Sequence, residues 1–415
     1  MVGLVSGCRS CGGRLAVTMA DLGLQPASNA FLESASAFQQ EKRYPLRAKV
    51  CEVCKLVQLD YDVAREELFA NYVYFSSYSD DWLKHAKAYC DMARARFALG
   101  PSSLVVELAS NDGYLLKNFL TMGVPVLGID PSDTVAAAAE KIGVPTLVQF
   151  FGQQVASDLA AKGRRADLII ANNVLAHVPQ LNDFIAGIAL LLRPGGSVTI
   201  EFPHLLELIA HVEFDTIYHE HYSYFSLFAI EQAFKRHGLR VYDVERLSTH
   251  GGSLRIFAAH AARTDLKDSA VLQEIRAQET AAGLPELSTY LQFSKRVDEC
   301  RDSLLAFLSG AKREGKRVAA YGAAAKGNTL MNFCAITPAD IAFVADRNPH
   351  KQNKFLPGTH IPVVSPEHLM QAKPDYVLIL PWNLSAEIRQ QLAGIKNWGG
   401  RFVTPVPLVR VDPLP

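Results

Sequence analysis

Five consecutive side chains able to move protons form the densest chemical cluster in the sequence, Tyr-His-Glu-His-Tyr from Tyr218 to Tyr222. Packing alone does not require this composition, because buried histidine and glutamate must each find hydrogen-bond partners. Three interpretations are open. A metal site is disfavoured, since His219 and His221 are two residues apart and would diverge on a helix. The others are a hydrogen-bonded structural corner and general acid–base catalysis, for which histidine has a suitable pKa of about 6.5.

Four cysteines near the N-terminus form a second chemical pattern. Cys8 and Cys11 make one C-x-x-C pair, and Cys51 and Cys54 make another. Two such pairs supply the four thiolates of a tetrahedral zinc site, which leaves no position open for water or substrate. A redox function is disfavoured because no thioredoxin-like unit surrounds either pair. We therefore expect a structural zinc, with the metal supplying much of the folding free energy of this module.

Composition limits the class of protein. The chain has 415 residues, which predicts two or three domains. Lysine plus arginine and aspartate plus glutamate both number 42, so charge gives no reason to expect nucleic acid or a membrane surface as partner. No run approaches the roughly 20 apolar residues of a membrane span, and no secretory pattern is seen. We expect a cytoplasmic protein.

The elements that position these groups begin near Ser102, where β-rich runs alternate with helical stretches. Four strands are predicted, at Leu104–Ala109, Pro125–Asp130, Ala166–Ala171 and Ser197–Phe202, with a tight turn at 193–196. This alternation predicts βαβ units and a parallel sheet that binds its ligand at the carboxyl ends of the strands. Asp130 ends the second strand, where a carboxylate suits the hydroxyls of a ribose. The absence of G-x-G-x-x-G favours a nucleoside ligand over a dinucleotide.

A second βαβ pattern lies near the C-terminus, beyond a helical connector at about 263–303. A strand enters a turn at Gly322, and a later strand ends at Asp346. The missing G-x-G-x-x-G argues against a nicotinamide dehydrogenase here as well. The backbone amides of the turn, together with Lys326, are suited to hold a diphosphate.

The ordered motifs E-L-A-S-N-D-G, G-I-D, A-N-N-V-L-A-H-V and L-R-P-G-G-S-V-T-I resemble the class I S-adenosylmethionine methyltransferases. Over nearly the whole chain, the sequence resembles the sugar C-methyltransferases that act on nucleotide-linked 4-keto-deoxysugars. The segments Y-H-E-H-Y-S and G-A-A-A-K-G-N carry that closer similarity. The resemblance implies an α/β protein with a zinc-binding module at 1–70, a Rossmann-like methyltransferase domain at 71–262 and a C-terminal Rossmann-like, nucleotide-sugar-binding domain at 263–415.

The resemblance also implies where the cofactor, S-adenosylmethionine, binds. Its methionine part would lie beside Glu107, Asn111 and Gly113, and its ribose beside Asp130. Asn172 and Asn173 would lie next to the adenine or the methionyl group. Taken singly, any of these residues could instead cap a strand end.

Carbon methylation requires removal of a proton, and a ketone acidifies the neighbouring carbon so that a positioned base can form an enolate. The expected roles are His221 as base, Glu220 as its orienting partner and Tyr218 beside the enolate oxygen. His177 is expected to face the same pocket, although packing would also explain it. Tyr72 matches a tyrosine that the family uses near the cofactor methyl, with interdomain packing as the alternative.

The expected substrate is a nucleotide-linked keto-sugar, with dTDP the favoured nucleotide, and a monomer is favoured. The residues expected to bind the substrate are Gly322, Lys326, Asn328, Asp346, Gly252 and Trp382. Two other functions are left open: O- or N-methylation of a small metabolite, and a non-catalytic cofactor-binding partner.

Overall fold

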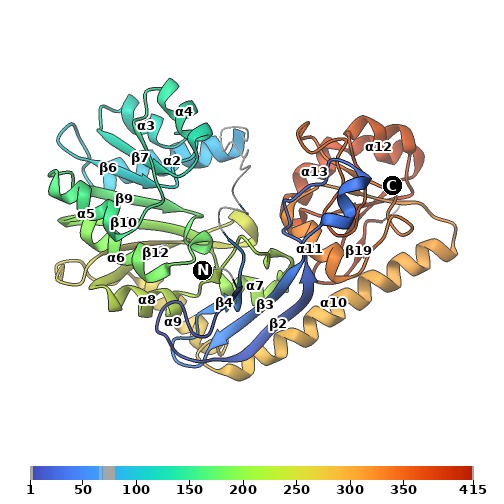
Figure 1. Ribbon diagram of the computed structural model, residues 1–415, viewed down its shortest axis with the longest axis horizontal. Coiled ribbons are helices and arrows are strands. Elements are labelled where there is room, and N and C mark those ends of the chain that lie inside the picture. The colour runs from blue at the N-terminus through green and yellow to red at the C-terminus, as the bar shows by residue number, and fades with distance from the viewer. Residues whose placement is uncertain (1–2, 65–67, 69–79, 414–415) are drawn as a thin grey trace.

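The computed structural model describes residues 3–64, 68 and 80–413. Tyr72, expected near the cofactor, lies outside the described residues. Two α/β bodies stand side by side, and a long hairpin together with the longest helix runs beneath both of them (Figure 1). No helix in the described part is long and apolar enough to cross a membrane.

The N-terminal module is a four-stranded sheet with the order β11-β4-β3-β2. Its strands β2, β3 and β4 span Leu15–Gln25, Tyr44–Cys51 and Val57–Leu59. The fourth strand, β11 (Ser223–Tyr224), comes from the end of the Tyr218–Tyr222 segment and pairs antiparallel with β4. Short strands β1 (Gly3–Leu4) and β5 (Tyr61–Asp62) pair beside it, and a 3-10 helix η1 occupies Ala35–Gln40.

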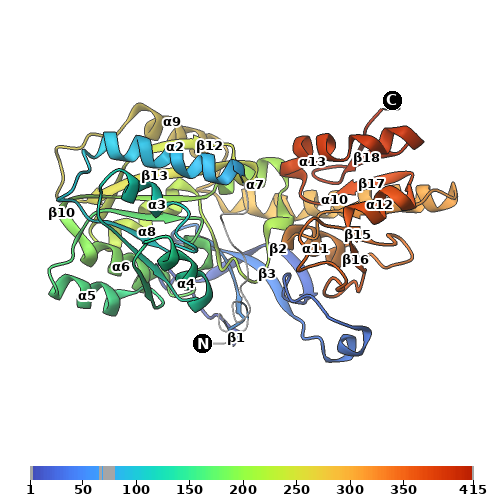
Figure 2. The same cartoon turned by 90° about the horizontal axis from the view of Figure 1, so that it is seen from above.

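The core of this module is shared with other parts of the chain. Met19 and Leu46 are fully buried in one cluster with Tyr290 and Phe293 of helix α10 (Leu287–Arg313). Figures 1 and 2 both show the β2–β3 hairpin lying along α10. Packing against this helix therefore stabilises the module in addition to any metal.

The central body is a seven-stranded sheet with the order β12-β13-β10-β9-β6-β7-β8. Five adjacent strands pair in parallel, β13 pairs antiparallel with β10, and β12 at the edge pairs antiparallel with β13. The parallel strands are β6 (Val105–Leu108), β7 (Val126–Asp130), β8 (Thr146–Val148), β9 (Ala166–Asn172) and β10 (Leu192–Pro203). The edge strands are β12 (Leu239–Leu247) and β13 (Ser253–His260).

Helices cover both faces of this sheet, as a doubly wound fold requires. One face carries α2 (Asp80–Arg96), α3 (Leu116–Thr121) and α4 (Asp133–Lys141). The other carries α5 (Gln153–Ala161), α6 (Leu181–Leu191), α8 (Leu227–Arg236) and α9 (Ala270–Ala281). Helix α7 (Leu205–His211) follows β10. Because α9 packs on α8 and β12, this body continues beyond residue 262, the boundary expected from the sequence.

The C-terminal body is a six-stranded sheet with the order β16-β15-β14-β17-β18-β19. The strands are β14 (Val318–Tyr321), β15 (Val344–Ala345), β16 (Val363–Val364), β17 (Tyr376–Ile379), β18 (Arg401–Thr404) and β19 (Arg410–Val411). The helices are α11 (Ala325–Phe333), α12 (Pro366–Ala372) and α13 (Ser385–Gln391), with 3-10 turns η6 (Trp382–Leu384) and η7 (Ala393–Trp398). The predicted Rossmann-like pattern is confirmed.

The four predicted central strands are present, with two local differences. The expected turn at 193–196 falls inside β10, where the pairing with β9 is irregular between Leu192 and Ser197. Strands β8, β12 and β13 were not predicted; the three residues of β8 are partly exposed at the sheet edge and give little periodic signal.

Candidate active site

The four N-terminal cysteines converge on one point. Their sulfur atoms all lie within 4.8 Å of one another, with Cys8 Sγ 3.5 Å from Cys54 Sγ and Cys11 Sγ 3.4 Å from Cys51 Sγ. The backbone amides of Ser10, Gly13 and Val53 each point at a cysteine sulfur at 3.4 Å, which stabilises thiolates. Four soft thiolates in this geometry match tetrahedral zinc, so the predicted metal site fits the structure.

The zinc module holds the Tyr218–Tyr222 segment directly. The Leu59 amide donates to the Tyr222 carbonyl at 3.0 Å. This bond lies next to the residues through which β4 and β11 pair. On the other side, the Tyr222 amide donates to the Ala176 carbonyl at 2.7 Å. The segment is thus clamped between the zinc module and the loop after β9, which also carries His177.

His221 is oriented by a backbone carbonyl. Its Nδ1 lies 3.0 Å from the Thr216 carbonyl oxygen, which can only accept, so Nδ1 carries the proton and Nε2 has the free lone pair. The Tyr218 hydroxyl lies 2.8 Å from Nε2, and the centres of the two rings are 4.0 Å apart. The ring of His177 meets that of His221 at a centroid distance of 4.8 Å. His221, Tyr218 and His177 are therefore brought together, as expected from the sequence.

Burial keeps these histidines neutral. It lowers the pKa of His221 well below its usual value, helped by the nearby His177. Burial likewise lowers the pKa of His177 to about 4. A neutral imidazole with an available Nε2 can accept a proton, which is the state that a general base needs.

The predicted pairing of Glu220 with His221 is wrong. The Glu220 carboxylate accepts a hydrogen bond from the Asn29 side chain at 2.6 Å, while Thr216 occupies the position expected for the orienting carboxylate. The chain turns at His219 and Glu220, and the His221 amide donates to the Tyr218 carbonyl at 2.9 Å, so the ends of the turn bring Tyr218 and His221 together while Glu220 lies at its centre. Burial raises the pKa of Glu220 to about 7. His219 is also directed away, with its ring 5.8 Å from that of Tyr44.

The expected cofactor residues gather at the carboxyl ends of β6, β7 and β9. Glu107 lies in β6, Asp130 ends β7 and Asn172 ends β9, on three neighbouring parallel strands of the sheet. Asn111 (φ 50°) and Asn173 (φ 54°) adopt left-handed backbone conformations, which cluster at functional sites. The Asp130 carboxylate accepts from the amides of Asn111 and Ser132, both at 3.0 Å.

Unpaired polar atoms mark the carboxyl ends of these strands as a ligand site. One oxygen of Glu107, the amide oxygen of Asn172 and both side-chain polar atoms of Asn173 are buried without a hydrogen-bond partner among the described residues. Burial raises the pKa of Glu107 well above its usual value. A β-carbon at Gly113 (φ 75°) would lie 3.0 Å from the Val144 side chain, so a larger residue would crowd this turn. The arrangement fits a polar nucleoside-type cofactor that satisfies these atoms.

The turn after Gly322 is held by Asp346, the acidic residue that follows strand β15. Asp346 accepts from the amides of Ala323 at 2.7 Å and Asn348 at 2.8 Å, so it positions the turn after Gly322. The Lys326 ammonium donates to Asn383 at 2.8 Å and lies 4.4 Å from the Trp382 ring centre. Asn328 is 1% exposed, and its side-chain amide has no hydrogen-bond partner in the described chain.

The two bodies meet at Trp382. Its indole nitrogen donates to Asp215 at 2.8 Å, just before the Tyr218–Tyr222 segment. Gly251, the neighbour of Gly252, has no room for a side chain, because a β-carbon would lie 2.8 Å from Trp382 and closer still to Glu213. Burial raises the pKa of Asp215 to about 6 and that of Glu213 to about 8. Lys326 opposes both shifts, so its charge lies close to these acids.

Sequence reasoning missed four residues of this site: Asn29, Glu213, Asp215 and Thr216. Glu213 and Asp215 lie shortly before the Tyr218–Tyr222 segment. This acidic pair could have indicated them as site residues, because buried carboxylates need polar partners. Asn29 has no such signal, since its partner is almost 200 residues away.

Comparisons with known proteins agree with this arrangement. Residues 8–69 match the family model of a putative zinc binding domain, 82–244 that of a methyltransferase domain and 248–407 that of a C-methyltransferase C-terminal domain. The C-methyltransferase NovU of Streptomyces niveus is 35% identical over 404 residues, covering 97% of this chain and 96% of that protein.

More distant similarities cover a smaller part of the chain. A ubiquinone biosynthesis O-methyltransferase of Methylobacterium sp. is 35% identical over 109 residues, 24% of this chain and 43% of that protein. Magnesium protoporphyrin IX methyltransferase from Synechocystis, solved with bound SAH, is 19% identical with a TM-score of 0.35, covering 43% of this chain and 83% of that one.

Proposed function

The chain belongs to the family of S-adenosylmethionine-dependent C-methyltransferases with a zinc-binding domain, and from that premise we propose that it methylates the carbon next to the ketone of a nucleotide-linked 4-keto-deoxysugar, with dTDP the favoured nucleotide. The observation that carries the proposal is the Thr216–His221–Tyr218 hydrogen-bonded chain, which starts at a fixed carbonyl near the junction of the two α/β bodies. Such a chain suits removal of a carbon-bound proton, a step that methylation of an oxygen or nitrogen does not need.

The proposed reaction begins when His221 Nε2 takes the proton from the carbon next to the ketone. The electron pair left on carbon delocalises onto the ketone oxygen, forming an enolate. The Tyr218 hydroxyl, released from Nε2, donates its hydrogen bond to that oxygen. The Thr216 carbonyl continues to accept the Nδ1 proton and so stabilises the imidazolium.

The cofactor supplies an electrophilic methyl group on its sulfonium. Asp130 and the polar groups of Glu107, Asn172 and Asn173 would hold it at the carboxyl ends of the central strands. With the cofactor bound, the enolate carbon would take its methyl group, one C–C bond forming as one C–S bond breaks. The protein contributes mainly the alignment of the two reactants.

Substrate placement follows from the C-terminal turn. The Gly322 turn and Lys326 would bind the diphosphate, and Trp382 would pack beside it. Helix α11, which carries Lys326, packs against residues 214–216, and its Thr329 hydroxyl donates to the Ile217 carbonyl at 3.2 Å, so Lys326 lies on an element next to the segment that carries His221. A sugar attached to a diphosphate at Lys326 therefore extends toward His221.

The proposal is tested by isotope exchange. The full-length zinc-loaded protein is incubated with a panel of dTDP-4-keto-6-deoxysugars in deuterated water, with and without S-adenosylmethionine, and product masses are measured by mass spectrometry. We expect one deuterium next to the ketone without the cofactor and one added methyl group with it. Absence of both across the panel contradicts the sugar assignment, whereas methylation without any exchange contradicts the enolate mechanism.

A further inference from the structure

His250 is a histidine of the central body that the proposed reaction does not use. It lies in the 3-10 turn η5 (Thr249–Gly251), which joins β12 to β13, and its backbone is left-handed, with φ 56° and ψ 19°. Non-glycine residues keep this conformation where the surrounding structure imposes it, and they cluster at active sites and ligand sites. Solvent reaches the residue, so it does not serve the packed core.

A buried carboxylate holds this turn in place. Glu201, near the end of β10, is fully buried and accepts a hydrogen bond from the Thr249 hydroxyl at 3.1 Å. The Gly252 carbonyl accepts from the His204 amide at 2.9 Å. The backbone on both sides of His250 is therefore fixed to the carboxyl end of a central strand, where α/β sheets place their ligands.

On one side His250 approaches the turn assigned to the cofactor. Its ring meets that of Trp82, in the first turn of α2, at a centroid distance of 6.0 Å. Trp82 in turn stacks on Tyr114 at 6.3 Å. Tyr114 directly follows Gly113, which is expected beside the methionine part of the cofactor. Trp82 thus bridges His250 and the residue that follows the cofactor turn.

On the other side the turn touches Trp382 of the C-terminal body. A β-carbon at Gly251 would lie 2.8 Å from the Trp382 ring, so the backbone of the turn packs directly on that ring. The Lys326 ammonium, proposed to bind the diphosphate, lies 4.4 Å from the centre of the same ring. His250 therefore lies at the junction of the elements proposed for the cofactor and for the diphosphate, where the sugar must be for methyl transfer.

The imidazole of His250 is available to a ligand. Enclosure by the neighbouring elements, and after it the Lys326 charge, lowers its pKa to about 4 although solvent reaches the residue. It is therefore neutral at pH 7, with one N–H donor and one acceptor nitrogen. Neither nitrogen has a hydrogen-bond partner among the residues that the structure describes. His85, the other histidine that meets Trp82, is instead paired with Glu201 at 3.0 Å.

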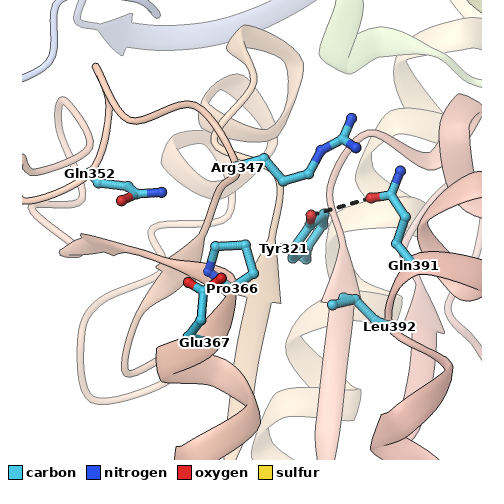
Figure 3. A pocket seen from close by; sticks show the side chains of 7 residues that line it. All are labelled: Tyr321, Arg347, Gln352, Pro366, Glu367, Gln391 and Leu392. Atoms are coloured by element: carbon cyan, nitrogen blue, oxygen red, sulfur yellow. Dashed lines mark hydrogen bonds between the residues drawn. The ribbon is translucent and has the colours of Figure 1, made fainter.

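The hollow of the C-terminal body shown in Figure 3 is a separate feature, with a volume of about 390 Å³. Tyr321 and Leu392 in its lining are 5% and 4% exposed, and the Tyr321 hydroxyl donates to Gln391 at 3.4 Å. These side chains are engaged within their own body, whereas the turn of His250 touches both bodies.

We propose that His250 is a further substrate-binding residue, which hydrogen-bonds a polar substituent of the sugar ring and so determines which ring hydroxyls the enzyme requires. This role rests on the proposed nucleotide-sugar function. It differs from the role of His221, because His250 binds the sugar without taking its proton. The rigid turn fixes the direction of the imidazole before the substrate binds, which reduces the entropy lost on binding.

The test uses the full-length zinc-loaded protein and two variants, His250→Gly and His250→Asn, because glycine and asparagine adopt the left-handed backbone readily. KM for the dTDP-4-keto-6-deoxysugar that the wild type methylates should rise about tenfold in His250→Gly, the size of one lost hydrogen bond. His250→Asn retains an N–H donor and should stay within about threefold of wild type. Solvent exchange at saturating sugar should change less than about threefold in both variants, because the base is untouched.

Two further measurements locate the contact on the sugar. The inhibition constant of dTDP should be equal in His250→Gly and wild type, because dTDP lacks the keto-sugar. Analogues that lack the hydroxyl at carbon 2 or at carbon 3 of the sugar are then compared. The analogue without the contacted hydroxyl should raise KM about tenfold in the wild type and leave KM of His250→Gly unchanged.

Lys373→Gly is the matched control, because Lys373 is an exposed left-handed residue (φ 47°) that follows α12 in the C-terminal body. It should change neither KM nor solvent exchange. An unchanged melting temperature and an unchanged cofactor affinity show that each variant is folded.

An unchanged KM in His250→Gly, or a dTDP inhibition constant that rises with KM, would overturn the sugar contact while the proposed function stands. A loss of solvent exchange as large as that of His221→Asn would also overturn it, because His250 would then act on the proton. If the wild-type protein neither exchanges nor methylates any sugar of the panel, the proposed function itself fails.

Discussion

The indole nitrogen of Trp382 donates a hydrogen bond to the buried carboxylate of Asp215, joining two residues that are 167 positions apart. Asp215 is fully buried and precedes Thr216, whose carbonyl orients His221. The bond therefore joins the C-terminal body, next to its proposed substrate-binding turn, to the residue that precedes the carbonyl orienting the proposed base.

Loss of this bond is expected to affect both stability and substrate binding. Trp382→Phe leaves the Asp215 carboxylate buried without its donor, which should lower the free energy of unfolding by about 1–3 kcal/mol. We also expect KM for the proposed nucleotide sugar to rise up to about tenfold, because phenylalanine offers Lys326 a smaller ring than tryptophan does.

Trp398→Phe is the matched control, since its indole donates to Pro374 within the C-terminal body at 2.9 Å. It should reduce stability without raising KM. Equal KM changes in the two variants would contradict a specific role for the Trp382–Asp215 contact.

Substitution of the proposed base should separate catalysis from binding. His221→Asn is expected to slow solvent exchange and methyl transfer by roughly 10²–10⁴-fold, with cofactor affinity unchanged. His211→Asn, which alters an exposed histidine of α7, is the control. Exchange and turnover near the wild-type rate in His221→Asn would exclude this residue as the base.

The corrected position of Glu220 predicts a smaller effect there. Glu220→Gln retains an oxygen that accepts from Asn29, so turnover should fall less than about tenfold, the size of one neutral hydrogen bond. A loss as large as that of His221→Asn, measured in the same exchange assay, would restore Glu220 as the orienting partner.

Cofactor affinity should depend on Asp130. Asp130→Ala removes the expected ribose ligand and the acceptor of two backbone amides, so the Kd for S-adenosylmethionine should rise about 10- to 100-fold. Asp133→Asn changes an exposed carboxylate at the start of α4 and should bind normally. Normal binding by Asp130→Ala, measured by calorimetry, would remove the residue from the cofactor site.

Acid should destabilise the active site through its histidines. The pKa of His177 is lowered to about 4 by burial, whereas in the unfolded chain it lies near 6.5. The unfolded state thus binds more protons between these values. The stabilising contribution is complete above pH 6.5 and is lost as the pH falls toward 4.

Urea unfolding between about pH 7 and 4.5 measures this dependence. His177→Asn should flatten the acid limb by up to roughly 1 kcal/mol per pH unit. Identical pH profiles for His177→Asn and wild type would show that His177 does not titrate in this way.

Zinc removal should disorder more than the metal site. Cys11→Ser is expected to lose the bound zinc and at least roughly 3 kcal/mol of stability, since metal binding stabilises such modules strongly. Turnover should fall with it, because β4 pairs with β11 next to His221. Cys90→Ala removes a buried cysteine elsewhere and should keep its zinc, as metal analysis would show. Full activity of a zinc-free protein would contradict the inference that the zinc module holds the Tyr218–Tyr222 segment in place.

Local patterns in the sequence predicted the parts of the site that depend on local geometry. The C-x-x-C spacing predicted the zinc site, and the strand ends predicted where Asp130 and Asn172 gather. Contacts between distant segments could not be predicted in this way. The Thr216 carbonyl has no sequence signature, because every residue has a carbonyl, and the Asn29–Glu220 bond depends on how the N-terminal hairpin packs.

The pairing of β4 with β11 and the Trp382–Asp215 bond make the active site a product of the entire polypeptide. During synthesis the proposed base, His221, leaves the ribosome before Trp382, which belongs to the proposed substrate site. The proposed assignment therefore predicts that methyl transfer requires the folded C-terminal body. For the same reason, a single cut between the two α/β bodies is expected to abolish turnover in one step, with no partly active fragment.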